Sequence, residues 1–182
     1  MKLVNFFAVQ LARFWRFNGL FQPLPLRIIH LLVAVLVVFE FVLIGLEDVF
    51  PSALHYHKFI GMGLCVLALV MLAYSFILRG VKYFYPYFWG DFTQLKSDFA
   101  QSLKFKIVPL RPMGLAATVR GLGFIALILT LIFGLTTVFL WRGAGDLHGF
   151  SASLLMIYLL CHGGMALVRF VIWEKKVFNK KA

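Results

Sequence analysis

Four long apolar segments, separated by polar links, dominate the pattern of hydrophobic and polar positions along the chain. They run from about residue 28 to 46, 55 to 79, 114 to 141 and 147 to 173, and each is long enough for a helix that crosses a bilayer. Helices are the expected form because the backbone of a membrane span must satisfy its own hydrogen bonds. The pattern therefore predicts one all-α integral membrane domain over residues 1–182, an antiparallel bundle of four transmembrane helices.

Two further segments lie outside these spans. Residues 1–20 are aromatic and basic and lack a small-residue cleavage site, so we expect an uncleaved interfacial helix that rests on lipid, with its arginines at anionic headgroups. Residues 80–113 form the one substantial loop, in which Asp91 is placed to cap a short helix. The predicted apolar face of that helix consists of Phe92, Leu95, Phe99 and Leu103.

The distribution of basic residues predicts the orientation. Lys and Arg number four before the first span, none from residue 47 to 57, five in residues 80–113 and four after Trp173. Positive-inside bias then places both termini and the loop of residues 80–113 in the cytoplasm. Because the net charge of +11 follows from this topology, we assign no nucleic-acid role to it.

Two histidines, fourteen residues apart, mark the fourth span. Fourteen residues at about 100° each fall roughly 40° short of four turns, so His148 and His162 leave one helix face about 21 Å apart along the axis. Polar side chains inside lipid face the bundle interior and need partners there. Taken alone, the two residues are equally well explained as unrelated side chains that hydrogen-bond to neighbouring helices.

The expected topology supplies a partner for each of them. His57 and His148 both lie near the outer start of their helices, whereas His30 and His162 both belong to the inner half. Each pair provides the two axial imidazoles that a low-spin haem needs, so the sequence predicts two haem b groups. His30 and His162 differ in depth, and we expect helix tilt or an inward extension of the fourth helix to bring them level.

His55 competes with His57 as the ligand from the second span. Residues two apart on a helix point about 200° away from one another, so only one of these rings faces the bundle. We favour His57, because Gly61 lies one turn later and leaves room for a flat macrocycle. His55 is then expected at the surface.

Several other residues have two interpretations. Arg27, Arg120 and Arg169 fall near the inner surface, where they either bind the propionates of the inner haem or anchor the helices at the headgroups. Glu40, deep in the first span, is either a proton carrier for quinone chemistry or a protonated side chain hydrogen-bonded between helices. Glycines of the spans either clear space beside porphyrins or bring helices together: Gly61, Gly63, Gly121, Gly123, Gly163 and Gly164.

Three short motifs together resemble the bacterial cytochrome b561 family. They are RIIH at residues 27–30, HKFIG at residues 57–61, and the two histidines of the fourth span followed by GGMALVRF. The chain is also similar to the cytochrome b subunits of nickel-iron hydrogenases. The resemblance implies a four-helix dihaem cytochrome of the bacterial inner membrane that exchanges electrons with the quinone pool. The ligands that it implies are His30, His57, His148 and His162.

The sequence leaves three functions open. The first is dihaem electron transfer across the membrane between the quinone pool and a redox partner, such as a periplasmic cytochrome or a dehydrogenase subunit. A membrane-anchor subunit of a hydrogenase or other dehydrogenase complex is the second, and it would carry the same haems. The third is a histidine-lined metal or proton transporter that uses Glu40 along a polar path.

Overall fold

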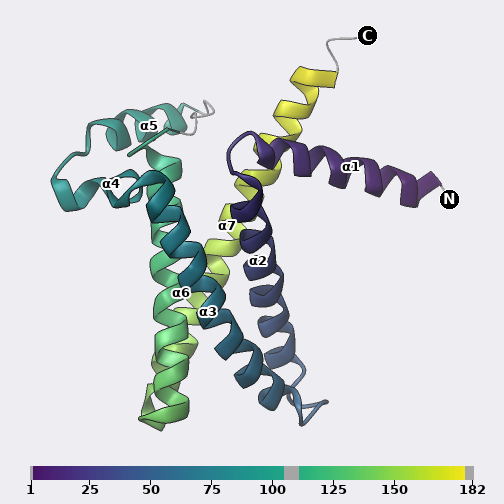
Figure 1. Ribbon diagram of the computed structural model, residues 1–182, viewed down its shortest axis with the longest axis vertical. Coiled ribbons are helices and arrows are strands. Elements are labelled where there is room, and N and C mark those ends of the chain that lie inside the picture. Colours follow the sequence, from purple (N-terminus) through teal and green to yellow (C-terminus); the bar gives the residue numbers. More distant parts are fainter. Residues whose placement is uncertain (1, 105–110, 179–182) are drawn as a thin grey trace.

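The computed structural model describes residues 2–104 and 111–178, which form seven α-helices and two short 3-10 helices (Figure 1). Four helices of this part of the chain are long and apolar enough to cross a membrane. They are α2 (Leu24–Gly45), α3 (Ala53–Arg79), α6 (Leu115–Phe139) and α7 (Gly145–Phe178). The prediction of an all-α membrane bundle with four spans is confirmed.

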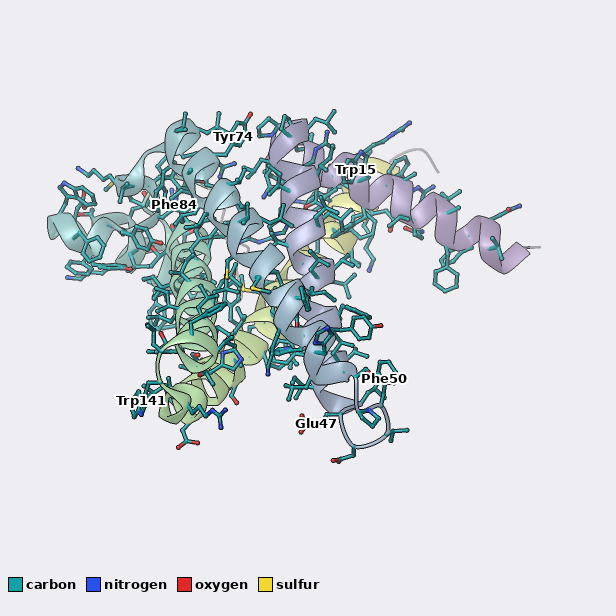
Figure 2. The ribbon with its side chains drawn as sticks, turned by 60° about the horizontal axis from the view of Figure 1, so that its bottom comes forward. Trp15, Glu47, Phe50, Tyr74, Phe84 and Trp141 are labelled. Carbon is teal, nitrogen blue, oxygen red and sulfur yellow. The ribbon has the colours of Figure 1, made fainter. Side chains whose placement is uncertain are left out.

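The four spans pack as two antiparallel hairpins, α2 with α3 and α6 with α7, and the hairpins meet where α3 packs against α6. Both hairpin turns lie at one end of the bundle, marked by Glu47, Phe50 and Trp141, while Trp15 and Phe84 lie toward the other end (Figure 2). The remaining elements are α1 (Lys2–Gly19), α4 (Val81–Phe84), η1 (Pro86–Trp89), α5 (Thr93–Leu103) and η2 (Arg142–Ala144). Helices α1, α4 and α5 and the end of α7 thus share one side of the molecule (Figure 1).

Two helix boundaries differ from the predicted ones by several residues: the start of α2 and the end of α7. α2 begins at Leu24, four residues before its predicted start, because Pro23 serves as the N-cap and Pro25 falls in the first turn. Proline is tolerated there, since the missing N–H has no partner in that turn. α7 continues to Phe178, five residues past its predicted end, because the charged sequence after Trp173 contains no helix breaker.

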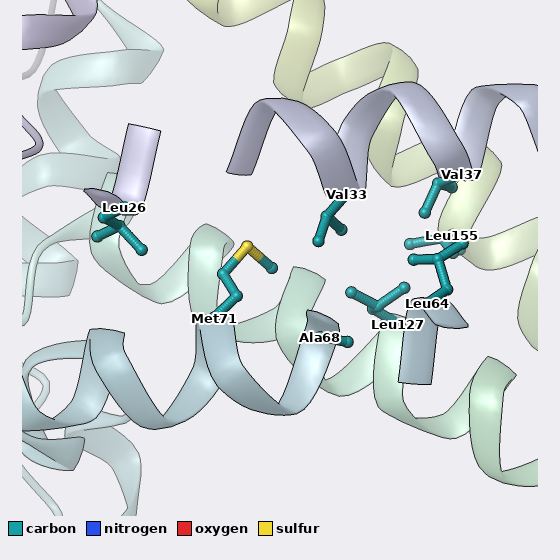
Figure 3. Packing of buried hydrophobic residues seen from close by; sticks show 8 residues of the cluster. All are labelled: Leu26, Val33, Val37, Leu64, Ala68, Met71, Leu127 and Leu155. Carbon is teal, nitrogen blue, oxygen red and sulfur yellow. The ribbon is translucent and has the colours of Figure 1, made fainter. Parts of the chain in front are cut away.

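An apolar layer holds the hairpins together midway along the bundle (Figure 3). Its buried side chains come from all four spans: Leu26, Val33, Val37, Leu64, Ala68, Met71, Leu127 and Leu155. Leu155 is seven residues from His148 and seven from His162, so it lies on nearly the same face of α7, halfway between them. The interior of the bundle is therefore apolar between the two levels at which the histidines lie.

Helix α1 leaves the bundle at a steep angle and contacts it through its C-terminal half (Figure 1). There Phe17 is buried and packs against Phe170 and Trp173 of α7. Arg13, which the sequence places at lipid headgroups, forms an ion pair with Glu174 instead. The N-terminal segment is thus attached to the last span by aromatic packing and one ion pair.

A buried carboxylate ties α5 to the start of α6. Asp98 is fully buried and accepts hydrogen bonds from Arg111 Nε at 3.0 Å, from Gln94 Nε2 at 2.7 Å and from the Leu115 N–H at 2.9 Å. Burial raises the pKa of Asp98, but these hydrogen bonds outweigh burial and hold the pKa below its usual value. An anion at the first turn of α6 also interacts favourably with the helix dipole.

The short helix expected in the loop is present as α5, but its buried residue is not an apolar one. Phe99 and Leu103 of the predicted apolar face are exposed, whereas Asp98 is buried. Asp91 accepts one hydrogen bond, from the Thr93 N–H at 3.3 Å, from a position just outside the helix. Residues 105–110 of this loop lie outside the described part of the chain.

Replacing Asp98 with asparagine should loosen the attachment of α5. The change leaves Arg111 without its anion, which costs about 1–3 kcal/mol and lowers the thermal midpoint by several degrees. Because the folded pKa is depressed, the wild type has this stabilisation above the usual aspartate pKa and loses it as the pH falls through the folded value. Thermal unfolding in detergent between neutral and acidic pH should therefore show a smaller pH dependence for the variant. Asp91→Asn is the matched control, and equal shifts for both variants would contradict the attachment.

Candidate functional site

The first histidine pair lies in the half of the bundle that adjoins α1. His30 comes from the second turn of α2 and His162 from the middle of α7, and their ring centres are 6.2 Å apart with the planes inclined by 65°. Tyr158, one turn before His162, stacks on the ring of His162 with the centres 5.2 Å apart. α7 continues to Phe178, well beyond His162. This agrees with the inward extension that was one of the two expected ways to bring His162 level with His30.

The second pair lies in the opposite half, near the hairpin turns. His57 comes from the second turn of α3 and His148 from the start of α7, with ring centres 6.0 Å apart and planes inclined by 65°. His55 is exposed and packs its ring against Phe59 at 4.7 Å. The structure thus brings His57, and not His55, to His148.

The spacing in both pairs suits two imidazoles on opposite sides of one metal. A metal–imidazole bond is about 2 Å long, and the bonding nitrogen lies about 1 Å from the ring centre, so the two ring centres should be about 6 Å apart. The observed separations of 6.0 and 6.2 Å agree with this value. The residues present therefore fit two bis-histidine haems, and the assignment of the four histidines as ligands stays a prediction.

His148 is held in position by α6. Its Nδ1 lies 2.9 Å from the carbonyl oxygen of Thr130. Because a carbonyl can only accept, Nδ1 carries the hydrogen and Nε2 keeps the lone pair that a metal needs. Gly134 provides the space, since a Cβ there would be 3.1 Å from the His148 ring. Neither Thr130 nor Gly134 could be predicted from the sequence, because only the packing of α6 against α7 places them opposite His148.

Glu40 contacts His57 across the interface between α2 and α3. Its Oε2 is in close contact with Nδ1 of His57, and the Glu40 side chain is buried, with 8% of the residue exposed. A Cβ on Gly61, one turn beyond His57, would be in ordinary van der Waals contact with Oε1 of Glu40, at 3.9 Å. Glu40 therefore has a partner on the neighbouring helix.

A cavity of about 1010 Å³ adjoins the pair of His30 and His162. The arginines that line it are Arg27, Arg79, Arg120 and Arg169. Arginine binds carboxylates well, so these arginines would suit the propionates of a haem held by His30 and His162. Three of these arginines are the ones that the sequence indicated, and Arg79 was missed because it stood only as the end of a span.

Two of these arginines also tie α1 and the residues that follow it to the cavity. Arg27 donates a hydrogen bond to the carbonyl of Trp15 at 3.0 Å, and its guanidinium lies 4.6 Å from the Trp15 ring centre. Gly19 leaves room for it, since a Cβ there would be 2.8 Å from the guanidinium. Arg79 donates a hydrogen bond to the carbonyl of Phe21.

The glycines of the spans fall into two groups. A Cβ on Gly121 would lie 2.8 Å from the backbone oxygen of Phe84, and one on Gly123 would overlap the ring of Tyr158. These two glycines allow protein elements to approach closely. No atom of the described chain lies within 4 Å of a Cβ built on three others: Gly63, Gly163 and Gly164.

Comparison with known proteins agrees with this arrangement. A family model described as prokaryotic cytochrome b561 matches residues 22–180, which include all four spans and both histidine pairs. No curated protein and no solved structure matches the chain. Since the family match covers most of the chain, haem b binding and a role in electron transfer apply to it. The chain therefore belongs to the prokaryotic cytochrome b561 family of multi-pass bacterial membrane proteins.

Proposed function

We propose that the protein is a dihaem cytochrome that carries electrons across the bacterial inner membrane, between the quinone pool and a redox partner. The observation that carries this proposal is the presence of two imidazole pairs, His30 with His162 and His57 with His148, in opposite halves of one bundle. His148 and His162 are separated by about 21 Å along α7. This distance is most of the thickness of a hydrocarbon core, which is about 30 Å. When bound, haem supplies the one-electron exchange between ferric and ferrous iron.

The chain binds and orients the two groups and keeps the space between them dry. α7 contributes one histidine to each pair, so a single rigid helix fixes their separation. The carbonyl of Thr130 fixes the orientation of His148. Between the pairs, the side chains packed around Leu155 are apolar, which disfavours the passage of ions and water. This arrangement favours movement of electrons over movement of ions.

The end of the bundle that carries α1 and α5 is assigned to the cytoplasm. It holds most of the basic residues, whereas the turns at the other end, residues 46–52 and 140–144, contain a single arginine, Arg142. Positive-inside bias supports this orientation. The pair of His30 and His162 is then the inner one, and the pair near the hairpin turns is the outer one.

The inner cavity is the proposed meeting point with quinone. It extends from the inner pair along α1, where Leu11, Phe14 and Trp15 line it, and these side chains suit a lipid-soluble ring. Exposed Phe6 and Phe7 would rest in the headgroup region and hold α1 at the membrane surface. A periplasmic cytochrome or a dehydrogenase subunit would exchange electrons at the outer pair. Co-purification of a catalytic subunit would identify the chain as a membrane anchor of a larger complex.

Each histidine of the two pairs should be required for one haem. We expect two haem b groups per purified chain, and one after replacement of His148 or of His162 by alanine, because the two pairs are separate. Haem extraction and reduced-minus-oxidised absorbance measure both quantities. His57→Ala should lower the haem content, whereas exposed His55→Ala should not. One haem in the wild type would exclude a dihaem protein, and a colourless protein would favour transport of metal or protons.

Replacing Arg120 with glutamine should lower the midpoint potential of the inner haem. A guanidinium stabilises ferrous iron over the more positive ferric iron, and the effect is strong in an apolar interior. A tenfold change in the ferrous–ferric equilibrium corresponds to about 59 mV, and we expect a shift of this order in potentiometric titration. Arg16→Gln, on an exposed part of α1, is the control. No shift, or the same shift in both variants, would contradict the placement of Arg120 at the inner haem.

A further inference from the structure

The two histidine pairs have opposite electrostatic surroundings. Four arginines line the cavity beside the inner pair, whereas one ring of the outer pair is in contact with a carboxylate, that of Glu40. Charges act strongly over short distances in an apolar interior because little solvent screens them. The same cofactor would therefore have different electron affinities at the two positions.

Helix α2 contributes to both positions. Ten residues, or about 15 Å of helix, separate His30 from Glu40, so the helix that supplies a ring to the inner pair brings a carboxylate to the outer pair. Oε2 of Glu40 meets Nδ1 of His57. Both carboxylate oxygens and this Nδ1 are buried, and none of the three forms a hydrogen bond with a described residue, so the close approach of Glu40 to His57 is the polar contact that the structure gives them. The carboxylate is thus directed at His57 rather than shared among several donors.

The opposite ring of the outer pair provides a comparison within the same site. Nδ1 of His148 faces a neutral acceptor, the carbonyl oxygen of Thr130, at 2.9 Å. Nδ1 of His57 faces the acidic side chain of Glu40. Both rings therefore have an acceptor at Nδ1, which leaves Nε2 of each ring for the metal, and they differ in the charge of that acceptor.

We propose that Glu40 is a positioning residue of the outer haem. Its carboxylate accepts a hydrogen bond from Nδ1–H of His57 and lowers the midpoint potential of the outer haem. The inference rests on the dihaem function proposed above. An acceptor at Nδ1 fixes the tautomer and orientation of a ligand and raises the basicity of its Nε2, and the negative charge stabilises ferric over ferrous iron. The arginines favour ferrous iron at the inner pair.

The proposal also gives a direction for electron transfer between the two haems. One electron leaves the outer iron, which becomes ferric, and the same electron reduces the inner iron, which becomes ferrous, so the step is balanced without a further reactant. Because the carboxylate favours the ferric state at one position and the guanidinium groups favour the ferrous state at the other, this transfer is downhill from the outer to the inner haem.

The test is potentiometric titration of the full chain with both haems bound, for the wild type and for Glu40→Gln. Glutamine keeps the shape and an acceptor oxygen but removes the charge. We expect both haems to stay bound, the inner midpoint to stay unchanged, and the ferrous–ferric equilibrium of the outer haem to change about tenfold toward ferrous, which is about 59 mV upward. The low-spin EPR signal of the outer ferric haem should shift as well, because it reports the ligand field of His57.

Two further variants separate positioning from general charge. Glu47→Gln removes an exposed carboxylate near the same end of the bundle and should leave both midpoints unchanged. Glu40→Asp retains the charge and should keep the outer midpoint below that of Glu40→Gln. If Glu40→Gln lost the outer haem, retention of that haem at a low potential in Glu40→Asp would support the role of the carboxylate.

The proposal would be overturned by an unchanged outer midpoint in Glu40→Gln, by equal shifts in Glu40→Gln and Glu47→Gln, or by loss of the outer haem in both Glu40 variants. These outcomes leave two haems in the wild type and so leave the proposed function intact. A wild-type chain with fewer than two haems would instead remove the proposed function, and this inference with it.

Discussion

The interior of the bundle is organised by two imidazoles that leave one face of a single helix. In α7, His148 and His162 are partly buried and project toward the neighbouring helices, and each ring needs a partner there to offset the cost of its burial. α3 supplies the partner at one level and α2 the partner at the other. The 14-residue interval therefore fixes the spacing of both sites, whatever the rest of the bundle does. The hairpin topology determines which rings can meet at each level.

The packing between helices follows from the same requirement. Gly134 lets α6 approach the His148 ring closely enough for the Thr130 carbonyl to orient it. Gly123 does the same for Tyr158, which in turn stacks on the ring of His162. Each ring of α7 thus depends on a place in α6 where a side chain is missing. The strong contact between α6 and α7 is explained by these two close approaches as well as by apolar packing.

Periodicity and topology account for what the sequence predicted well. The spans, the shared helix face of His148 and His162, and the expectation that only one of His55 and His57 faces the bundle all follow from the geometry of one helix or from the order of helices. The helix ends were less predictable, because hydropathy was used to find the end of α7 although helix formation continues through its charged tail. The start of α2 is another case, since it was predicted at about residue 28 and lies at Leu24, with Pro25 in the first turn.

Apart from the two histidine pairs, the specific contacts between helices could not be predicted from the sequence. Whether Glu40 meets a histidine or lipid depends on the rotation and crossing of α2 and α3, and nothing in the spacing along one helix determines these. The same holds for Thr130 opposite His148. Asp98 is a stronger example. The sequence predicted an apolar contact face for α5, but the structure has a buried carboxylate there, stabilised by hydrogen bonds from Gln94, Arg111 and the first turn of α6.

The electrostatic difference between the two histidine pairs is linked to the orientation of the protein in the membrane. Positive-inside bias gathers arginines at one end of any such bundle, so a cofactor near that end acquires positive neighbours without a dedicated site. The acidic residues beside the turns at the opposite end, Glu47, Asp48 and Asp146, are exposed, so solvent and salt screen their charges. A negative neighbour for the outer pair therefore requires a specific carboxylate inside a span, and Glu40 is placed in that way. The arginines at one end, which topology gathers, and the single carboxylate of Glu40 at the other thus both increase the difference in electron affinity between the two pairs.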